Sequence, residues 1–282
     1  MGQMRLSSPI AADEGFALPP PSPSSNPLHA DALDALGSTP PPFRAALREM
    51  DMPDLPTAAP FTGFSPEGLA FLSGLAEAQN RDWFEAHKAI YERELRQPMA
   101  ALVNALGFAF AVHELDLACD PKRAIFRIHR DVRFSKDKRP YKTHIGASLT
   151  RSGEKLAPGL VYIHIDPTGS FVAGGAFRPE PPLLHKLRLR IRDRQEEILA
   201  ITADLAAKGL TLSDDEALKS RPRGFEDVDD ADAIALLKLK SLITRRDLPQ
   251  DLVMDGDRLI AAIVTFTQQV YPLLRFVWRG VI

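Results

Sequence analysis

The chain of 282 residues has a single cysteine, Cys119, and no segment typical of export or of a membrane. One thiol cannot form an intrachain disulfide, nor can it supply a zinc site built from several cysteines. The first residues lack the charged and apolar regions of a signal peptide. The longest apolar runs, such as residues 259–264, are far shorter than the roughly 18 residues that a membrane-spanning helix needs. These absences predict a cytoplasmic protein without a membrane partner.

The sequence also lacks the common catalytic signatures. It contains no phosphate-binding G-x-x-x-x-G-K-[ST] loop, no G-x-G-x-x-G dinucleotide fingerprint, no G-x-S-x-G nucleophile elbow and no H-E-x-x-H metal helix. What it does contain is the composition of an ordinary globular protein, with 45% hydrophobic and 26% charged residues. This composition excludes a collagen, a coiled coil and wholesale disorder, but it indicates no cofactor and no reaction.

Proline and charge divide the chain at about residue 60. Residues 1–60 hold 12 of the 24 prolines, with three basic and seven acidic residues. A segment of this kind cannot bury enough apolar surface to offset the entropy lost on ordering. We therefore predict a disordered, proline-rich acidic tail over residues 1–60, whose partner the sequence does not identify, and a single domain over residues 61–282.

Hydrophobic spacing predicts helices at both ends of this domain and strands between them. Helices are expected from Pro66, from residue 81 to 95, from Pro98 to about Leu117, from Pro181 to about Lys208, over 230–243 and over about 254–270, where Pro272 disturbs the end. Alternation with a period of two predicts strands over residues 126–134, 143–150, 160–166 and 170–177. Short links between the strands favour an α+β fold, with an antiparallel sheet of about four strands flanked by N-terminal and C-terminal helices.

Positive charge is concentrated between residues 121 and 155. This segment holds eleven basic and three acidic residues, a net charge of +8, whereas the rest of the chain after residue 60 holds 21 basic and 27 acidic residues. The whole chain has a net charge of −2. The basic segment is therefore a local feature, and we look there for a binding site.

Arginine and lysine side chains near the turn between the first two predicted strands are candidates for holding a phosphate or another anion. Arg130 occupies the apolar phase of its predicted strand and needs a partner, either an acid such as Glu85 or a bound anion. The candidate ligand-binding residues are Arg127, Arg130, Arg133, Lys136, Lys138, Tyr141, Lys142 and Arg223, with the backbone amides of Gly174 and Gly175. The alternative is a solvated turn in which Arg130 and Asp131 form stabilising ion pairs.

Three histidines lie on the polar phase of neighbouring predicted strands: His129, His144 and His164. An antiparallel sheet can bring them to one face, near Asp131 or Asp166, as an acid–base group or a metal site. The candidate catalytic residues are therefore Asp131 and these three histidines. Ordinary surface histidines are the alternative, because the strand register is unknown, and we assign no metal from the sequence.

A long motif accompanies the basic segment: R-x-x-R-D-x-R-F-S-x-D-K-x-P-Y-K over residues 127–142. It is preceded by N-R-x-W-F at residues 80–84 and followed by Gly174-Gly175 and by R-P-R-G-F at residues 221–225. Together these motifs resemble the bacterial family of domains of unknown function numbered 2461. The resemblance covers about residues 61–279 and implies a single domain with a shared site. It implies no activity for that site.

Three functions are compatible with these features. The first is an enzyme, or a binding protein, for a phosphorylated or other anionic ligand held by the basic motif. The second is a non-catalytic nucleic-acid-binding module, in which Phe134, Tyr141 and Tyr162 stack on bases. The third is an adaptor, whose tail recruits a partner or folds back over the basic face as an electrostatic lid. The sequence favours the first and does not decide whether the protein is an enzyme.

Overall fold

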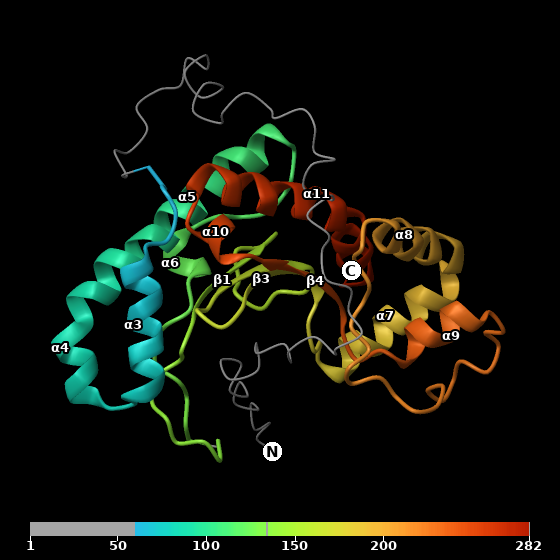
Figure 1. The fold of residues 1–282 in the computed structure, drawn as a ribbon. Coiled ribbons are helices and arrows are strands. Elements are labelled where there is room, and N and C mark those ends of the chain that lie inside the picture. Colours follow the sequence, from blue (N-terminus) through green and yellow to red (C-terminus); the bar gives the residue numbers. More distant parts are fainter. Residues whose placement is uncertain (1–59, 134, 282) are drawn as a thin grey trace, which may run out of the picture.

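Figure 1 shows the fold in a computed structural model, which describes residues 60–133 and 135–281. The tail predicted over residues 1–60 lies, but for its last residue, outside the described residues. The first described helix is α3, Pro66–Glu77. The Ser65 side chain caps it by accepting a hydrogen bond, 3.1 Å long, from the backbone amide three residues further on. The predicted helix start is confirmed.

The next helix runs from Arg81 to Val112 without a break. It comprises α4 (Arg81–Tyr91), a π-helical turn (Glu92–Arg96) and α5 (Gln97–Val112). Pro98 lies in the first turn of α5, directly after the π-helical turn has interrupted the regular hydrogen bonding. A regular α-helix thus begins next to Pro98, as predicted, although it continues the preceding helical turns. The predicted end near Leu117 is wrong, because the helix ends at Val112 and Glu114 adopts a positive φ of 54°.

The sheet has four antiparallel strands in the order β1-β2-β3-β4, in agreement with the predicted α+β fold. The strands are β1 (Ile145–Thr150), β2 (Leu160–Ile165), β3 (Ser170–Ala176) and β4 (Leu242–Leu248). The first three confirm the strands predicted over residues 143–150, 160–166 and 170–177. Helices precede β1 and follow β3 in the chain, so the predicted arrangement of helices around a central sheet is confirmed as well.

The strand predicted over residues 126–134 is wrong for the part that the structure describes. That part is an extended loop, which pairs only through isolated bridges, of Ile125 with β1 and of His129 with Tyr141. Ion pairs within the loop, together with Pro140, which has no amide N–H to donate, prevent a regular ladder beyond these bridges. Alternation with a period of two therefore does not distinguish this loop from a strand.

The fourth strand begins where a helix over residues 230–243 is predicted. Helix α9 (Ala231–Lys238) covers only the first part of this range, and the chain then enters β4, which pairs with β3. β4 lies at the edge of the sheet, where polar side chains are common. Its run Arg245-Arg246-Asp247 hides the alternation of apolar and polar residues that identifies a strand in the sequence.

The remaining described helices pack on the sheet or on one another. They are α6 (Pro121–Ala124), α7 (Pro181–Asp193), α8 (Gln195–Ala207), α10 (Gln250–Val253) and α11 (Gly256–Val281). The single helix predicted from Pro181 to Lys208 is thus two helices that meet at Arg194. Pro272 lies inside α11 and does not end it, so the predicted disturbance there is wrong. α11 passes over the sheet and packs on β3, α5, α7 and α8 (Figure 1).

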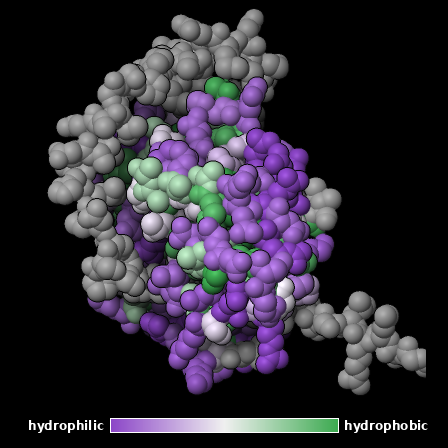
Figure 2. Space-filling model, turned by 90° about the vertical axis from the view of Figure 1, so that its right-hand side faces the viewer, coloured by the Kyte–Doolittle hydropathy of each residue, from purple (hydrophilic) through white to green (hydrophobic). Residues whose placement is uncertain are grey.

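The described residues include two helices that are long and apolar enough to cross a membrane, Arg81–Val112 and α11. Length and composition are weak evidence, because the core helix of a globular protein passes the same test. Twelve residues of α11 are buried inside the protein. Figure 2 shows hydrophilic residues over most of the visible face on the side of α7, α8 and α9. Both helices contribute side chains to the main core, and we interpret them as core helices. The cytoplasmic location stays a prediction.

The two faces of the sheet bury different side chains. One face, with Ile163 and Val172, joins the helices in the main hydrophobic core. The other face carries a separate cluster, which consists of Phe126, Leu160, Tyr162, Phe171, Ala173 and Ile243, with Phe177 packed against it. We call this the second sheet face. This face is rich in aromatic rings, which are common in ligand-binding sites.

Candidate functional site

The second sheet face combines aromatic rings with positive charge. The Tyr162 ring lies between those of Phe126 and Phe171, with centroids 5.9 and 6.0 Å away. Lys142 and Lys155 place their ammonium groups 5.2 and 5.3 Å from the centroid of the Phe126 ring. These distances are typical of cation–π contacts. Two cations thus share one aromatic ring on this face.

A third cation on this face is Arg245 of β4. Its guanidinium lies 5.1 Å from the Phe171 ring centroid and 3.4 Å from a carboxylate oxygen of Asp247. Lys142 is only 8% exposed, so its charge lies in a medium of low dielectric constant, where its attraction to an anion is strong. Sequence reasoning missed Lys155, which lies outside the motif, and Arg245, which lies in the strand that was not predicted.

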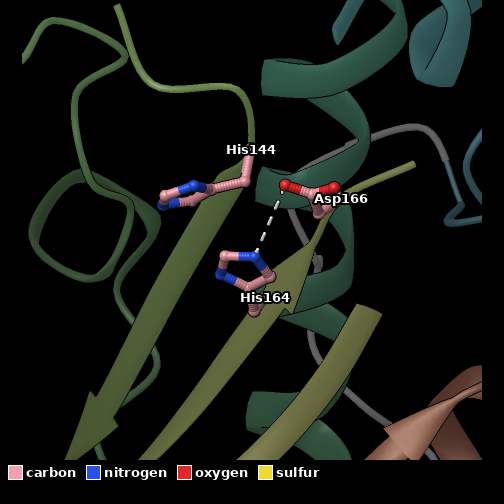
Figure 3. A group of neighbouring side chains, drawn as sticks. All are labelled: His144, His164 and Asp166. Carbon is pink, nitrogen blue, oxygen red and sulfur yellow. Dashed lines mark ion pairs between the residues drawn. The ribbon is translucent and has the colours of Figure 1, made fainter. Parts of the chain in front are cut away.

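Two histidines and one carboxylate meet at the end of this face where β1 begins and β2 ends (Figure 3). The strand register places Ile145 opposite Ile165, which sets His144 level with Asp166. His164 lies two residues before Asp166 and therefore points to the same face. One donor atom of each of the three side chains lies within 4.8 Å of the others, and His164 Nε2 is 3.8 Å from Asp166 Oδ2.

Neighbouring side chains hold this group in place. The Tyr162 hydroxyl is hydrogen-bonded to Nδ1 of His164 at 3.2 Å, and the His164 ring stacks on Phe171 with centroids 4.5 Å apart. Asp166 Oδ1 accepts hydrogen bonds from the amide and the hydroxyl of Thr168, at 2.8 and 2.6 Å. The remaining atoms, Nε2 of the histidine and Oδ2 of the aspartate, face each other.

Burial sets the protonation states in this group. Burial, reinforced by the nearby charges of His164 and Lys142, lowers the pKa of His144 from 6.5 to about 3. Burial raises the pKa of Asp166, but hydrogen bonds from His164 and Thr168 outweigh it and hold that pKa below its ordinary value. At neutral pH the group therefore contains a neutral imidazole at His144 and a carboxylate at Asp166.

The basic motif forms a loop that pairs much of its own charge. We call residues 127–142 the basic loop. Arg130, for which the sequence leaves Glu85 or an anion as partners, pairs instead with Asp137, from Nη1 to Oδ2 at 2.8 Å. Arg139 reaches the same Oδ2 at 2.7 Å. One carboxylate thus joins two guanidinium groups and fixes the turn.

The other end of the basic loop is held in a similar way. Arg133 pairs with Asp131 at 2.6 Å, and hydrogen bonds from the Arg133 side chain and amide lower the pKa of Asp131 to about 2. The Lys138 ammonium donates to the Val132 carbonyl oxygen at 2.9 Å, while Lys136 is exposed. These contacts support a stabilising role for the loop arginines beside any role in binding.

His129 lies outside the histidine–carboxylate group. It is exposed, and its ring packs beside those of Phe84 and Tyr141, with centroids 5.7 and 5.2 Å away. Tyr141 is buried and stacks on Phe84. The structure therefore brings two of the three predicted histidines together, with Asp166 rather than Asp131 as the neighbouring carboxylate.

The glycine pair of β3 is explained by close packing. A Cβ atom on Gly174 would lie 2.7 Å from Val270 of α11, and one on Gly175 would lie 2.0 Å from the Leu242 carbonyl oxygen of β4. Gly175 also has a φ of 137°, which favours glycine. Both glycines thus let α11 and β4 approach the strand closely. This packing explains the presence of two glycines without a role in anion binding.

The last predicted residues lie in varied surroundings. Arg223 is exposed in the segment between α8 and α9. Burial raises the pKa of Cys119 to about 12, so its thiol is protonated and unreactive at neutral pH. A small hollow beside β4 is lined by residues that include Ser213 and Lys240, and its wall contains the ion pair of Arg178 with Glu216. Phe177 and Ile243 of the second sheet face also line that hollow, but none of the three candidate histidines does.

The chain is thus an α+β protein whose four-stranded antiparallel sheet carries a basic, aromatic face and a histidine–carboxylate group at one end. Comparison with protein families matches residues 67–276 to the family described as conserved hypothetical protein, DUF2461. This match covers most of the chain, which therefore belongs to that family, as the basic motif indicates. No curated protein and no solved structure matches the chain.

Proposed function

We propose that the protein binds an anionic small molecule with a planar or apolar part on the second sheet face. The observation that carries this proposal is the placement of three cations against aromatic rings on one face: Lys142 and Lys155 over Phe126, and Arg245 over Phe171. The opposite face is filled mainly by aliphatic side chains, which pack in the main hydrophobic core.

An anionic ligand is complementary in charge to this face. Charge-assisted hydrogen bonds from lysine and arginine to a phosphate or carboxylate are strong, and those of arginine are also directional. The aromatic rings supply the apolar surface of a small-molecule site, in which a few polar groups fix the orientation. The basic loop positions Lys142, because its own ion pairs hold the turn that leads into this residue.

A nucleic acid is the weaker candidate for the same face. Binding to a phosphate backbone needs many cations directed outward. In the basic loop, Asp131 and Asp137 instead pair with three arginines of the same loop. A compact ligand that meets two or three cations fits this arrangement better than a polyanion does.

Thermal stability of the full chain tests the proposal. The probes are inorganic phosphate, a nucleoside monophosphate, an aromatic carboxylate and a single-stranded oligonucleotide. The nucleoside monophosphate or the aromatic carboxylate should stabilise more than inorganic phosphate, because the rings contact their planar part. A ligand at 100 times its Kd adds about 2.7 kcal/mol, which raises the Tm by roughly 5 to 10 °C in a domain of this size.

Variants assign the effect to the face. Lys155→Met and Arg245→Met keep an apolar stem and remove the charge, so each should lose most of the shift. Arg258→Met is the control, because Arg258 is exposed and pairs with Asp251 elsewhere on the surface. No shift from any probe, or equal shifts in the two variants and the control, would refute the proposal. Salt-sensitive binding of the oligonucleotide alone would favour the nucleic-acid module.

A further inference from the structure

We infer that His144, His164 and Asp166 form a binding site for a divalent first-row transition-metal ion such as Zn²⁺ or Fe²⁺. Two imidazoles and one carboxylate are a ligand set that metalloproteins use while leaving coordination positions open to water or substrate. The β1–β2 register brings the three side chains to one end of the second sheet face. This inference does not depend on the anion site proposed above.

The distances suit a site of this kind. The three donor atoms lie within 4.8 Å of one another, with 3.8 Å between His164 Nε2 and Asp166 Oδ2. Ligands at about 2.1 Å from a tetrahedral ion are about 3.4 Å apart. His144 directly precedes β1 and is half-buried, so a bound ion requires an adjustment of this side chain and not of the sheet register.

The neighbours of the ligands orient them as in known metal sites. Metal-binding histidines use the second ring nitrogen for a hydrogen bond that fixes the ring. In His164 this nitrogen is Nδ1, which can donate to the Tyr162 hydroxyl oxygen when a metal ion takes the place of the proton on Nε2. Thr168 holds Oδ1 of the carboxylate and leaves Oδ2 on the side of the histidines.

An ion pair between His164 and Asp166 alone does not account for His144. Within the residues that the structure describes, the ring nitrogens of His144 form no hydrogen bond, although the side chain is held 4.2 Å from the His164 ring, centroid to centroid. A bound metal ion would accept a lone pair from each ring, which accounts for the close contact between the two histidines.

Metal titration of the full chain tests the inference. The protein is stripped with a chelator, then titrated with Zn²⁺ by calorimetry and with Co²⁺ by visible absorption. We expect one ion per chain and a cobalt spectrum without the charge-transfer bands of thiolate ligands. His144→Gln and Asp166→Asn should each lower the affinity by about 100-fold or more. His185→Gln is the matched control, since His185 is exposed in α7, and it should keep the affinity.

Two results would overturn the inference. One is equal affinity in the two variants and the control, and the other is the absence of one-to-one binding of Zn²⁺, Co²⁺ or Fe²⁺ by the folded wild-type chain. If one variant fails to fold by circular dichroism, the other variant and the wild-type cobalt spectrum still decide. Arg245→Met should keep its metal affinity, so a failed anion site and a failed metal site give different results.

Discussion

Gly174 and Gly175 set how closely α11 and β4 can approach β3. A methyl group on Gly174 would lie 2.7 Å from a methyl of Val270 and 3.2 Å from the Phe266 ring, so side chains of α11 would have to shift. On Gly175 it would lie 2.0 Å from the Leu242 carbonyl oxygen, which belongs to the backbone and cannot rotate away. The positive φ of Gly175 adds strain for any other residue.

We predict that Gly174→Ala lowers the free energy of unfolding by about 1 to 3 kcal/mol, the usual cost of overpacking. Gly175→Ala should cost more than about 3 kcal/mol, because backbone strain adds to the contact. Gly169→Ala is the control, since no atom lies within 4 Å of its added Cβ, and it should change stability by less than about 0.5 kcal/mol. Urea unfolding measures all three. Equal costs would show that these contacts do not limit the packing.

At the scale of elements, sequence patterns succeed where one physical cause dominates. Ser65 and Asn80 each cap a helix with a side-chain oxygen, and both starts are predicted correctly. The strands β1 to β3 follow from alternation. The pattern fails for the basic loop, where ion pairs replace a ladder, and for β4, where Arg245-Arg246-Asp247 conceals a strand. In both cases charged side chains occupy the segment, and the alternation of apolar and polar residues does not show which contacts they make.

The basic loop depends on Asp137 more than on any other acid in it. Hydrogen bonds from the Arg139 side chain and amide, and from Arg130, hold the pKa of Asp137 well below its ordinary value, so it is ionised at neutral pH. We predict that Asp137→Asn loosens the loop and that trypsin then cleaves several-fold faster after Lys136 and Lys138, while the Tm of the domain changes little.

Limited proteolysis with mass spectrometry of the fragments measures this effect. Asp251→Asn is the matched control, because Asp251 pairs with an exposed arginine outside the basic loop. Equal cleavage rates in Asp137→Asn, the control and the wild-type chain would contradict a stabilising role for the carboxylate. The same measurement in the presence of the nucleoside monophosphate reports whether the loop responds to the anion.

At the scale of the whole molecule, the assembly of the site could not be predicted from the sequence. The sequence does identify the basic motif, His144, His164 and Asp166 as candidates. Their meeting depends on the β1–β2 register, and a slip of one residue would move His144 to the opposite face. Lys142 and Lys155 both lie over the Phe126 ring, because the basic loop and the turn after β1 place them next to it. The spacing of residues within one segment does not predict contacts between segments that are distant in the sequence.

Among the residues that the structure describes, both apolar clusters are built from residues 61–278. We predict that a chain beginning at residue 60 unfolds cooperatively, with a urea m value close to that of the full chain. Residues 1–60 carry three basic and seven acidic residues, against a net charge of +8 over residues 121–155. Removing the acidic segment removes a competitor for the cations, so the shortened chain should bind the nucleoside monophosphate more tightly.

Urea unfolding followed by near-ultraviolet circular dichroism, and thermal shifts with the nucleoside monophosphate, compare the full and shortened chains. A cooperative transition with a larger ligand shift in the shortened chain supports both predictions. Loss of the near-ultraviolet signal would mean that the packing of the domain needs the first 60 residues, because that signal arises from aromatic side chains held in fixed surroundings. An unchanged ligand shift in a folded, shortened chain would reject the electrostatic lid and leave recruitment of a partner as the role of the acidic segment.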